Sequence, residues 1–183
     1  MNIAFDIETT GLPPKGADWE IGYKDFPHIV QLSWIVGEKE NDYLIKPEGY
    51  EITAEMTAIH GTSHEQAMKN GHDLILVLKS FLFDAAGCEN LIGHNINFDT
   101  SVIKANLLRR GFDKERFNEI LHKDKRYDTM LKAMPVMGVS KWPKLGELYQ
   151  FLFKKDIDNQ HNALVDIRAT VECYLELKKR ISV

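Results

Sequence analysis

The chain has little cysteine and no excess of positive charge. Its two cysteines, Cys88 and Cys173, lie far apart and form no CxxC pair. Neither a zinc finger nor a disulfide framework is therefore supported, and a reducing compartment is the simpler assumption. The formal net charge of −4 provides no general basic field, which argues against a wide surface for duplex nucleic acid. The negative charge does not argue against an enzyme whose acidic site binds metal cations before it binds a phosphate.

The sequence also lacks a long apolar run. The longest such stretch, residues 74–83, is interrupted by Lys79 and Ser80 and is too short to span a membrane. At the N-terminus, Asp6 and Glu8 interrupt what would have to be the apolar part of a signal peptide. We therefore expect a cytoplasmic protein with no membrane partner.

The composition is that of a folded protein. Hydrophobic residues make up 44% of the chain and charged residues 27%, which are ordinary values for a globular domain. A length of 183 residues is sufficient to bury a core. Because no internal repeat, low-complexity segment or long linker divides the sequence, we expect a single domain over residues 1–183.

Apolar periodicity and turn residues predict strands first and interleaved helices later. We expect strands at residues 3–7, 28–36, 43–45 and 90–93, short helical segments after residue 53, and helices at 73–86, 98–110, 144–153 and 163–179. Asn41-Asp42 predicts a hairpin turn between the second and third strands. A polar stretch follows Gly111 and runs to Lys125. This order favours an α/β or α+β fold with a mixed sheet.

Two carboxylates occur close together in the first strand. Asp6 and Glu8 are two residues apart, so their side chains project from the same face while Phe5 and Ile7 point to the core. Adjacent carboxylates raise each other's pKa, and a bound divalent cation would remove this penalty. The alternative is a pair of surface acids at the end of a strand.

A third carboxylate, Asp99, follows the fourth strand in the segment GHNINFD, residues 93–99. Asn97 is placed to cap the following helix, which puts Asp99 in its first turn, where the helix dipole favours the ionised form. The same features are ordinary helix chemistry and require no function. Phe98 is by itself more typical of a core residue.

The fourth carboxylate, Asp166, stands at the start of the last helix in the segment HNALVD, residues 161–166. If Asn162 caps this helix, Asp166 is fixed on it and His161 lies just outside on a loop. A loop histidine with a pKa near neutrality suits a general base. The alternative is a solvated histidine before a helix cap.

Together, these segments resemble the DEDDh exonucleases, a family that includes the proofreading epsilon subunit of bacterial DNA polymerase III, ribonuclease T and oligoribonuclease. Three motifs occur in the order and spacing of that family: DIETTGL at 6–12, HNINFD at 94–99 and HNALVD at 161–166. The resemblance covers residues 3 to about 178 and is far more specific than any one motif. IHGT at 59–62 and YDT at 127–129 match further family segments.

The resemblance implies an α/β fold of the ribonuclease-H-like type, with a central mixed five-stranded sheet flanked by helices. It implies that four carboxylates bind two divalent metal ions: Asp6, Glu8, Asp99 and Asp166. By the same resemblance, His161 activates the attacking water. All-carboxylate ligation favours Mg²⁺ or Mn²⁺ over Zn²⁺. The implied activity is hydrolysis of phosphodiester bonds by two metal ions, with release of 5′-nucleotides from a 3′ end.

The resemblance further implies that Thr9 and Leu12 contact the terminal nucleotide and that Phe98 packs against the 3′ end. Such contacts tolerate every base, so limited sequence preference is expected. We expect the 3′ end of single-stranded DNA as the substrate. RNA is the alternative, because the choice depends on side chains that recognise or exclude the 2′-hydroxyl. A non-catalytic nucleic-acid-binding module is a further alternative, against which the presence of all five site residues argues.

Two features depart from the family pattern. Residues 15–27 lengthen the loop after the first motif, so we expect an individual wall for the substrate channel. The chain also ends directly after its last helix, without the tail by which the epsilon subunit binds its polymerase. A polymerase partner therefore stays open.

Other residues have simpler interpretations. His60 and His64 have the spacing of a zinc pair, but GTS at 61–63 argues against a continuous helix between them. Trp34, Trp142 and Tyr149 are expected in the core or at its edge. Basic residues are expected on solvated faces that could guide a phosphate backbone: Lys104, Arg109, Arg110 and residues 123–126.

Overall fold

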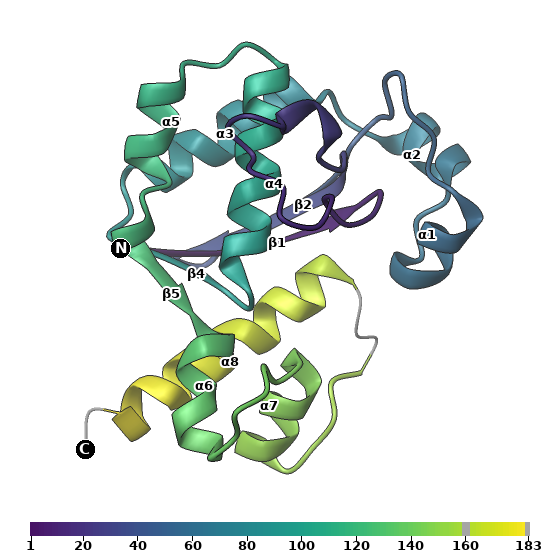
Figure 1. Ribbon diagram of the computed structural model, residues 1–183. Coiled ribbons are helices and arrows are strands. Elements are labelled where there is room, and N and C mark those ends of the chain that lie inside the picture. Colours follow the sequence, from purple (N-terminus) through teal and green to yellow (C-terminus); the bar gives the residue numbers. More distant parts are fainter. Residues whose placement is uncertain (159–161, 182–183) are drawn as a thin grey trace.

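A five-stranded sheet runs through the centre of the molecule, with helices on both faces (Figure 1). The computed structural model describes residues 1–158 and 162–181. The strands are β1 (Asn2–Thr9), β2 (Ile29–Val36), β3 (Lys39–Leu44), β4 (Asn90–Gly93) and β5 (Arg126–Asp128), in the order β3-β2-β1-β4-β5. The pairs β3-β2 and β2-β1 are antiparallel, whereas β1-β4 and β4-β5 are parallel. The predicted mixed five-stranded sheet is confirmed.

Two groups of helices cover the two faces of this sheet (Figure 1). The helices are α1 (Ala54–His60), α2 (His64–Asn70), α3 (Leu74–Ala86), α4 (Ile96–Arg109), α5 (Lys114–Ile120), α6 (Thr129–Met137), α7 (Leu145–Phe153) and α8 (Ala163–Ile181), with 3₁₀ turns η1 (Tyr23–Asp25) and η2 (Lys123–Lys125). One face is packed by α3 and α4, and α5 packs against both of these helices. The other face is covered by α8, which also contacts α6 and α7. Among the described residues, no helix combines the length and apolarity that crossing a membrane requires.

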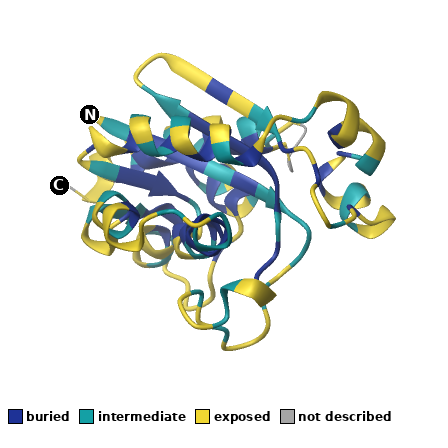
Figure 2. Cartoon of the chain, turned by 90° about the horizontal axis from the view of Figure 1, so that it is seen from above, coloured by how far each residue is buried: buried dark blue, intermediate teal, exposed yellow. Residues whose placement is uncertain are grey.

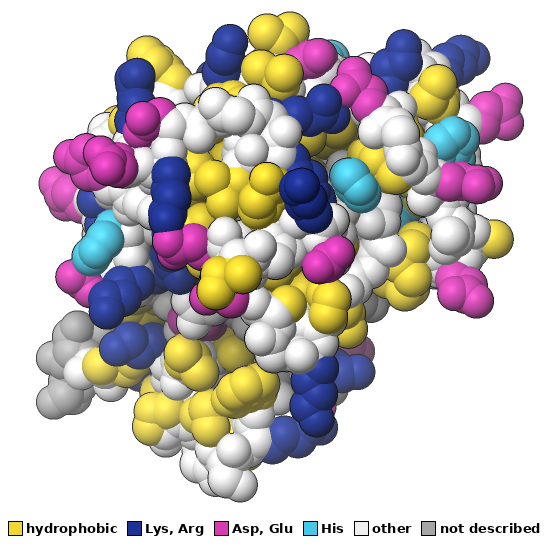
Figure 3. All heavy atoms as spheres, turned by 45° about the horizontal axis from the view of Figure 1, so that its top comes forward, with side chains coloured by type: hydrophobic (Ala, Val, Ile, Leu, Met, Phe, Trp, Pro, Cys, Tyr) yellow, Lys and Arg dark blue, Asp and Glu magenta, His cyan; other side chains and the backbone are white. Residues whose placement is uncertain are grey.

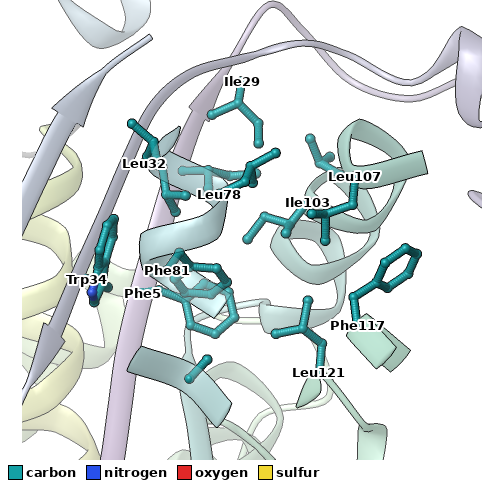
Figure 4. Packing of buried hydrophobic residues seen from close by; sticks show 14 of the residues in the cluster. Phe5, Ile29, Leu32, Trp34, Leu78, Phe81, Ile103, Leu107, Phe117 and Leu121 are labelled. Atoms are coloured by element: carbon teal, nitrogen blue, oxygen red, sulfur yellow. The ribbon is translucent and has the colours of Figure 1, made fainter. Parts of the chain in front are cut away.

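The larger core lies between β1, β2, α3 and α4 (Figure 4). Phe5 packs edge-on against Phe81 with 5.1 Å between ring centroids, and Trp34 contacts the same ring at 5.6 Å. Because side chains alternate along a strand, Phe5 and Ile7 enter this core while Asp6 and Glu8 point to the opposite face, as predicted. The face that carries chemistry is therefore the one covered by α8.

The smaller core joins the sheet to α8. Ala4 and Ile92 pack against Ile167 and Tyr174 of α8. Figure 2 shows the buried central strands between helices whose outer surfaces are exposed. Burial of α8 on this face brings its first turn towards the end of β1.

Several elements begin or turn elsewhere than the sequence predicted. The β2–β3 turn is at Gly37-Glu38, not at Asn41-Asp42, because Gly37 adopts the left-handed φ of 61°. Asn41 and Asp42 lie within β3, where Asp42 Oδ1 accepts hydrogen bonds from Gln31 Nε2 (2.6 Å) and Ser33 Oγ (2.5 Å). The expected polar stretch contains α5, which is capped by Asp113 and buries Phe117.

Helix α4 begins two residues earlier than predicted. Asn97 lies inside the helix, and the N-cap residue is Asn95, in the left-handed conformation with φ 66° and ψ 41°. The physical reason is a long-range contact: the backbone N–H of Asn95 donates to Asp128 Oδ1 at 3.0 Å. Asp99 still falls in the first turn, as predicted.

The predicted burial was wrong for Lys104 and Trp142 and is confirmed for Trp34 and Tyr149. Lys104 is 6% exposed instead of solvated, with its Nζ 5.0 Å from the centroid of the Trp19 ring. Trp142 is 65% exposed and so is no core residue, whereas Trp34 and Tyr149 are buried as expected. His60 and His64 belong to different helices, also as expected, because α1 ends at Gly61.

Candidate active site

Three carboxylates from β1 and α8 form one cluster. Asp6 and Glu8 project from the face of β1 that α8 covers, and Asp166 lies in the first turn of α8. One oxygen atom from each of these side chains lies within 4.8 Å of the others. The cluster thus contains two neighbours in the sequence and one residue from the other end of the chain. Its oxygens are close enough to share a cation.

The start of α8 is fixed by Asn162, as predicted. The carboxamide oxygen of Asn162 accepts from the N–H of Val165 at 3.3 Å, and its carbonyl accepts from the N–H of Asp166 at 2.9 Å. This cap orients the first turn and with it Asp166. The predicted general base, His161, lies outside the described residues, so its role stays a prediction.

The fourth predicted carboxylate, Asp99, comes from the first turn of α4. Its side chain is 4% exposed, and among the described residues its Oδ2 has no hydrogen-bond partner. Asp99 does not belong to the 4.8 Å cluster. It is nevertheless close enough to Asp6 and Glu8 for their negative charges to act on one another's pKa. The structure therefore gathers all four predicted carboxylates, three of them tightly and the fourth beside them.

A fifth carboxylate, Asp128, was not predicted as a site residue. It is buried at the end of β5, and its Oδ1 accepts hydrogen bonds from the N–H groups of Asn95 and Met130, both at 3.0 Å. Among the described residues its Oδ2 has no partner. Asp128 thereby holds Asn95, the left-handed N-cap residue of α4, in place. The available sequence signal was the YDT segment at 127–129, which places an acid between a strand and a helix.

Burial and mutual repulsion make this site unfavourable for negative charge. Burial first, and then the charges of Asp99, Glu8 and Asp166, raise the pKa of Asp6 well above its usual range. Burial and Asp166 raise the pKa of Glu8 to about 7. The pKa of Asp99 is raised by burial and then by Asp128 and Glu8. A bound cation would offset these effects, since it supplies the positive charge that the site lacks.

His94 links the end of β4 to more distant segments. Its Nδ1 lies 3.0 Å from Thr129 Oγ1 and its Nε2 lies 2.9 Å from the carbonyl oxygen of Pro143. Thr129 Oγ1 donates to the carbonyl of Gly93 at 3.1 Å. These contacts attach the start of α6 and the loop before α7 to the carboxyl end of β4, which neighbours β1.

The predicted substrate contacts occupy different environments. Thr9 Oγ1 donates to the carbonyl of Gly11 at 2.7 Å, which shapes the turn after β1. Leu12 is 83% exposed, so its side chain is available to a ligand. Phe98 is partly buried against the larger core. Their contacts with a nucleotide stay predictions.

The lengthened loop, residues 15–27, packs onto α4 and α5. The ring of Trp19 lies 6.1 Å from that of Phe117, measured between centroids. The guanidinium of Arg109 donates to the carbonyls of Lys24 (3.0 Å) and Pro27 (3.2 Å). The loop is therefore anchored to the C-terminal end of α4 and to α5, and is not a free insertion.

Comparison with known proteins places the chain in a family. Residues 3–174 match the sequence model of the family described as RNase_T, exonuclease. A DNA polymerase III subunit epsilon-like protein of Rhodobacter capsulatus is 33% identical over 178 residues, which cover 96% of this chain and 23% of the relative. A PolC-type DNA polymerase III of Caldanaerobacter subterraneus is 29% identical over 180 residues, 98% of this chain and 12% of the relative.

Solved structures show the same fold. Exonuclease I of E. coli in complex with a dT13 oligonucleotide matches with a TM-score of 0.74 and 19% identity, over 97% of this chain and 40% of that chain. Exonuclease I from Methylocaldum szegediense matches with a TM-score of 0.73 and 21% identity, over 98% and 40%. The chain thus spans less than half the length of these proteins. From the family match, the five-stranded sheet and the gathered carboxylates, we conclude that the chain belongs to the DEDDh-type 3′→5′ exonuclease family.

Proposed function

We propose that this chain is a metal-dependent 3′→5′ exonuclease domain that removes 5′-nucleotides from the end of single-stranded DNA. The observation that carries the proposal is the cluster of Asp6, Glu8 and Asp166, whose oxygens lie within 4.8 Å, with Asp99 buried beside it. A set of carboxylate oxygens favours hard divalent cations such as Mg²⁺ or Mn²⁺.

The residues present fit such cations. Among the described residues, Asp99 Oδ2 is buried without a hydrogen-bond partner, as expected of an atom that completes its coordination with a ligand. The raised pKa values of Asp6 and Glu8 have the same explanation. We assign the binding of two ions to Asp6, Glu8, Asp99 and Asp166. When bound, the ions lower the pKa of a coordinated water and stabilise negative charge on the phosphoryl oxygens.

The remaining roles belong to side chains around this cluster. We assign to His161 the removal of a proton from the attacking water, supported by its place directly before the Asn162 cap. We assign to Thr9, Leu12 and Phe98 the contacts with the terminal nucleotide, and the high exposure of Leu12 supports its part. These side chains would hold the scissile phosphate next to the carboxylates.

DNA is the substrate that the comparisons support. The relatives include a DNA polymerase III subunit epsilon-like protein and a PolC-type DNA polymerase III. The structure of exonuclease I that matches this chain contains a dT13 oligonucleotide. Figure 3 shows Lys and Arg side chains interspersed with Asp and Glu on the displayed face. Recognition of a single strand at its end suits this mixed surface better than recognition of a long duplex.

The test is degradation of matched single-stranded DNA and RNA labelled at the 5′ end. With Mg²⁺ or Mn²⁺, the DNA should give a descending ladder, and EDTA should abolish it. Asp6→Asn is the inactive control, because it keeps the shape of the side chain but removes a charged ligand. Activity in EDTA, immediate release of the labelled nucleotide, cutting of circular DNA, or a strong preference for RNA would contradict the proposal.

A further inference from the structure

Trp142 is an indole that the protein core does not use. It is 65% exposed, on the loop of residues 138–144 that joins α6 to α7 (Figure 1). The other two tryptophans have structural partners. Trp34 is fully buried and donates its indole N–H to Asp84 at 2.8 Å, and Trp19 packs against Phe117. Tryptophan is enriched at binding surfaces, because its ring offers a large apolar area together with a polar N–H.

The loop that carries Trp142 is fixed at the carboxyl end of β4, next to the strand that carries Asp6 and Glu8. The carbonyl oxygen of Pro143, the next residue, lies 2.9 Å from His94 Nε2. His94 directly follows β4, which runs parallel to β1 with Ala4 opposite Ile92, so His94 lies beside the part of β1 that carries Asp6 and Glu8. The backbone next to Trp142 is thus held in place while its ring is largely exposed, so binding a ligand there need not order this part of the loop.

The opposite end of the loop is fixed as well. The N–H of Lys144 donates to Glu147 Oε2 at 2.8 Å, where α7 begins. Lys141 and Lys144 flank the Trp142-Pro143 pair, and both lysines are exposed. In a chain with a net charge of −4, these are local cations beside an exposed aromatic ring. Surfaces that bind single-stranded nucleic acid combine a stacking ring with cations in this way.

We propose that Trp142, with Lys141 and Lys144, is a stacking site for an internal base of the single strand, upstream of the nucleotide at the carboxylates. The inference rests on the proposed function, since it takes single-stranded nucleic acid as the substrate. Every base presents a flat ring, so this site adds affinity without sequence preference. It also makes binding depend on strand length, because a dinucleotide held at the carboxylates leaves the indole empty.

Fluorescence tests the contact directly, without turnover. In EDTA, addition of oligothymidylate should quench the emission of the wild-type protein. Trp19→Phe should keep this quenching, whereas Trp142→Phe should abolish it and retain most of the affinity, since phenylalanine still stacks. Trp142→Ala should weaken binding by about 5- to 150-fold. Lys141→Gln should reduce the slope of log affinity against log salt by about 0.7.

Kinetics separates substrate binding from a structural role. Trp142→Ala should raise KM for long oligonucleotides and leave kcat at saturation and the cleavage of a dinucleotide unchanged. A fall in kcat on the dinucleotide, or a lower melting temperature, would show that Trp142 supports the fold and would overturn the inference. Turnover with unchanged KM and no quenching would also overturn it. Quenching without turnover in Mn²⁺ would sustain the stacking site and contradict the proposed function alone.

Discussion

Replacing Glu8 by glutamine is expected to stabilise the cation-free protein above neutral pH. Burial and the charge of Asp166 raise the pKa of Glu8 from 4.5 to about 7. The folded protein therefore holds this proton more tightly than the unfolded chain. Between pH 4.5 and about 7, the folded state binds more protons than the unfolded state, so the free energy of unfolding falls as pH rises.

The size of this effect follows from the shift. A pKa difference of about 2.5 units corresponds to about 3 kcal/mol of unfolding free energy, lost progressively as pH rises through this range. Below pH 4.5 both states carry the proton and this stability is fully present. The raised pKa values of Asp6 and Asp99 act in the same direction. Glutamine cannot ionise, so it removes the contribution of Glu8 and also the part that the charge of Glu8 plays in raising the pKa values of Asp6 and Asp99.

The assay is denaturant unfolding in EDTA at a series of pH values. The wild type should lose stability between pH 5 and 8 by about 3 kcal/mol more than Glu8→Gln. Glu38→Gln, in the exposed β2–β3 turn, is the matched control and should follow the wild type. Added Mn²⁺ should restore the wild type at high pH by binding the folded state, and should restore Glu8→Gln less. Identical pH profiles for wild type and Glu8→Gln would refute the reasoning.

Substitutions at three further positions test the base, the start of α4 and the core. His161→Ala should retain Mn²⁺ affinity in calorimetry and lower single-turnover rates by about 10²–10⁴-fold; loss of Mn²⁺ binding as severe as in Asp6→Ala would remove its role as a base. Asp128→Ala should cost about 1–3 kcal/mol in thermal unfolding, because the N–H groups of Asn95 and Met130 lose their acceptor. Asp128→Asn keeps that acceptor and should recover most of the loss; equal melting temperatures for both variants would contradict this. Phe81→Ala should cost about 3–5 kcal/mol in denaturant unfolding, since its fully buried ring packs against the larger core; a cost below about 1 kcal/mol would contradict the packing.

Local sequence patterns were enough to predict much of the frame of the site. Alternation along β1 placed Asp6 and Glu8 on one face and Phe5 on the other, because successive side chains of a strand point to opposite sides. The Asn162 cap at the start of α8 was predicted from the same kind of short-range rule. Such features depend only on residues a few positions away in the chain, so they can be predicted from a single sequence. The role of His161 stays a prediction from the family motif.

Other features depend on contacts between residues far apart in the chain. Helix α4 begins after Asn95 because Asp128, 33 residues later, accepts its N–H, and this contact also places an unpredicted carboxylate beside Asp99. Lys104 was expected in solvent and is buried, whereas Trp142 was expected in or beside the core and is exposed. The lengthened loop covers Lys104, whereas the loop of Trp142 is tied to His94 by its backbone and leaves the ring in solvent. The pattern of apolar residues predicts which side chains can be buried, but the contacts of each side chain depend on how the elements pack in the folded chain.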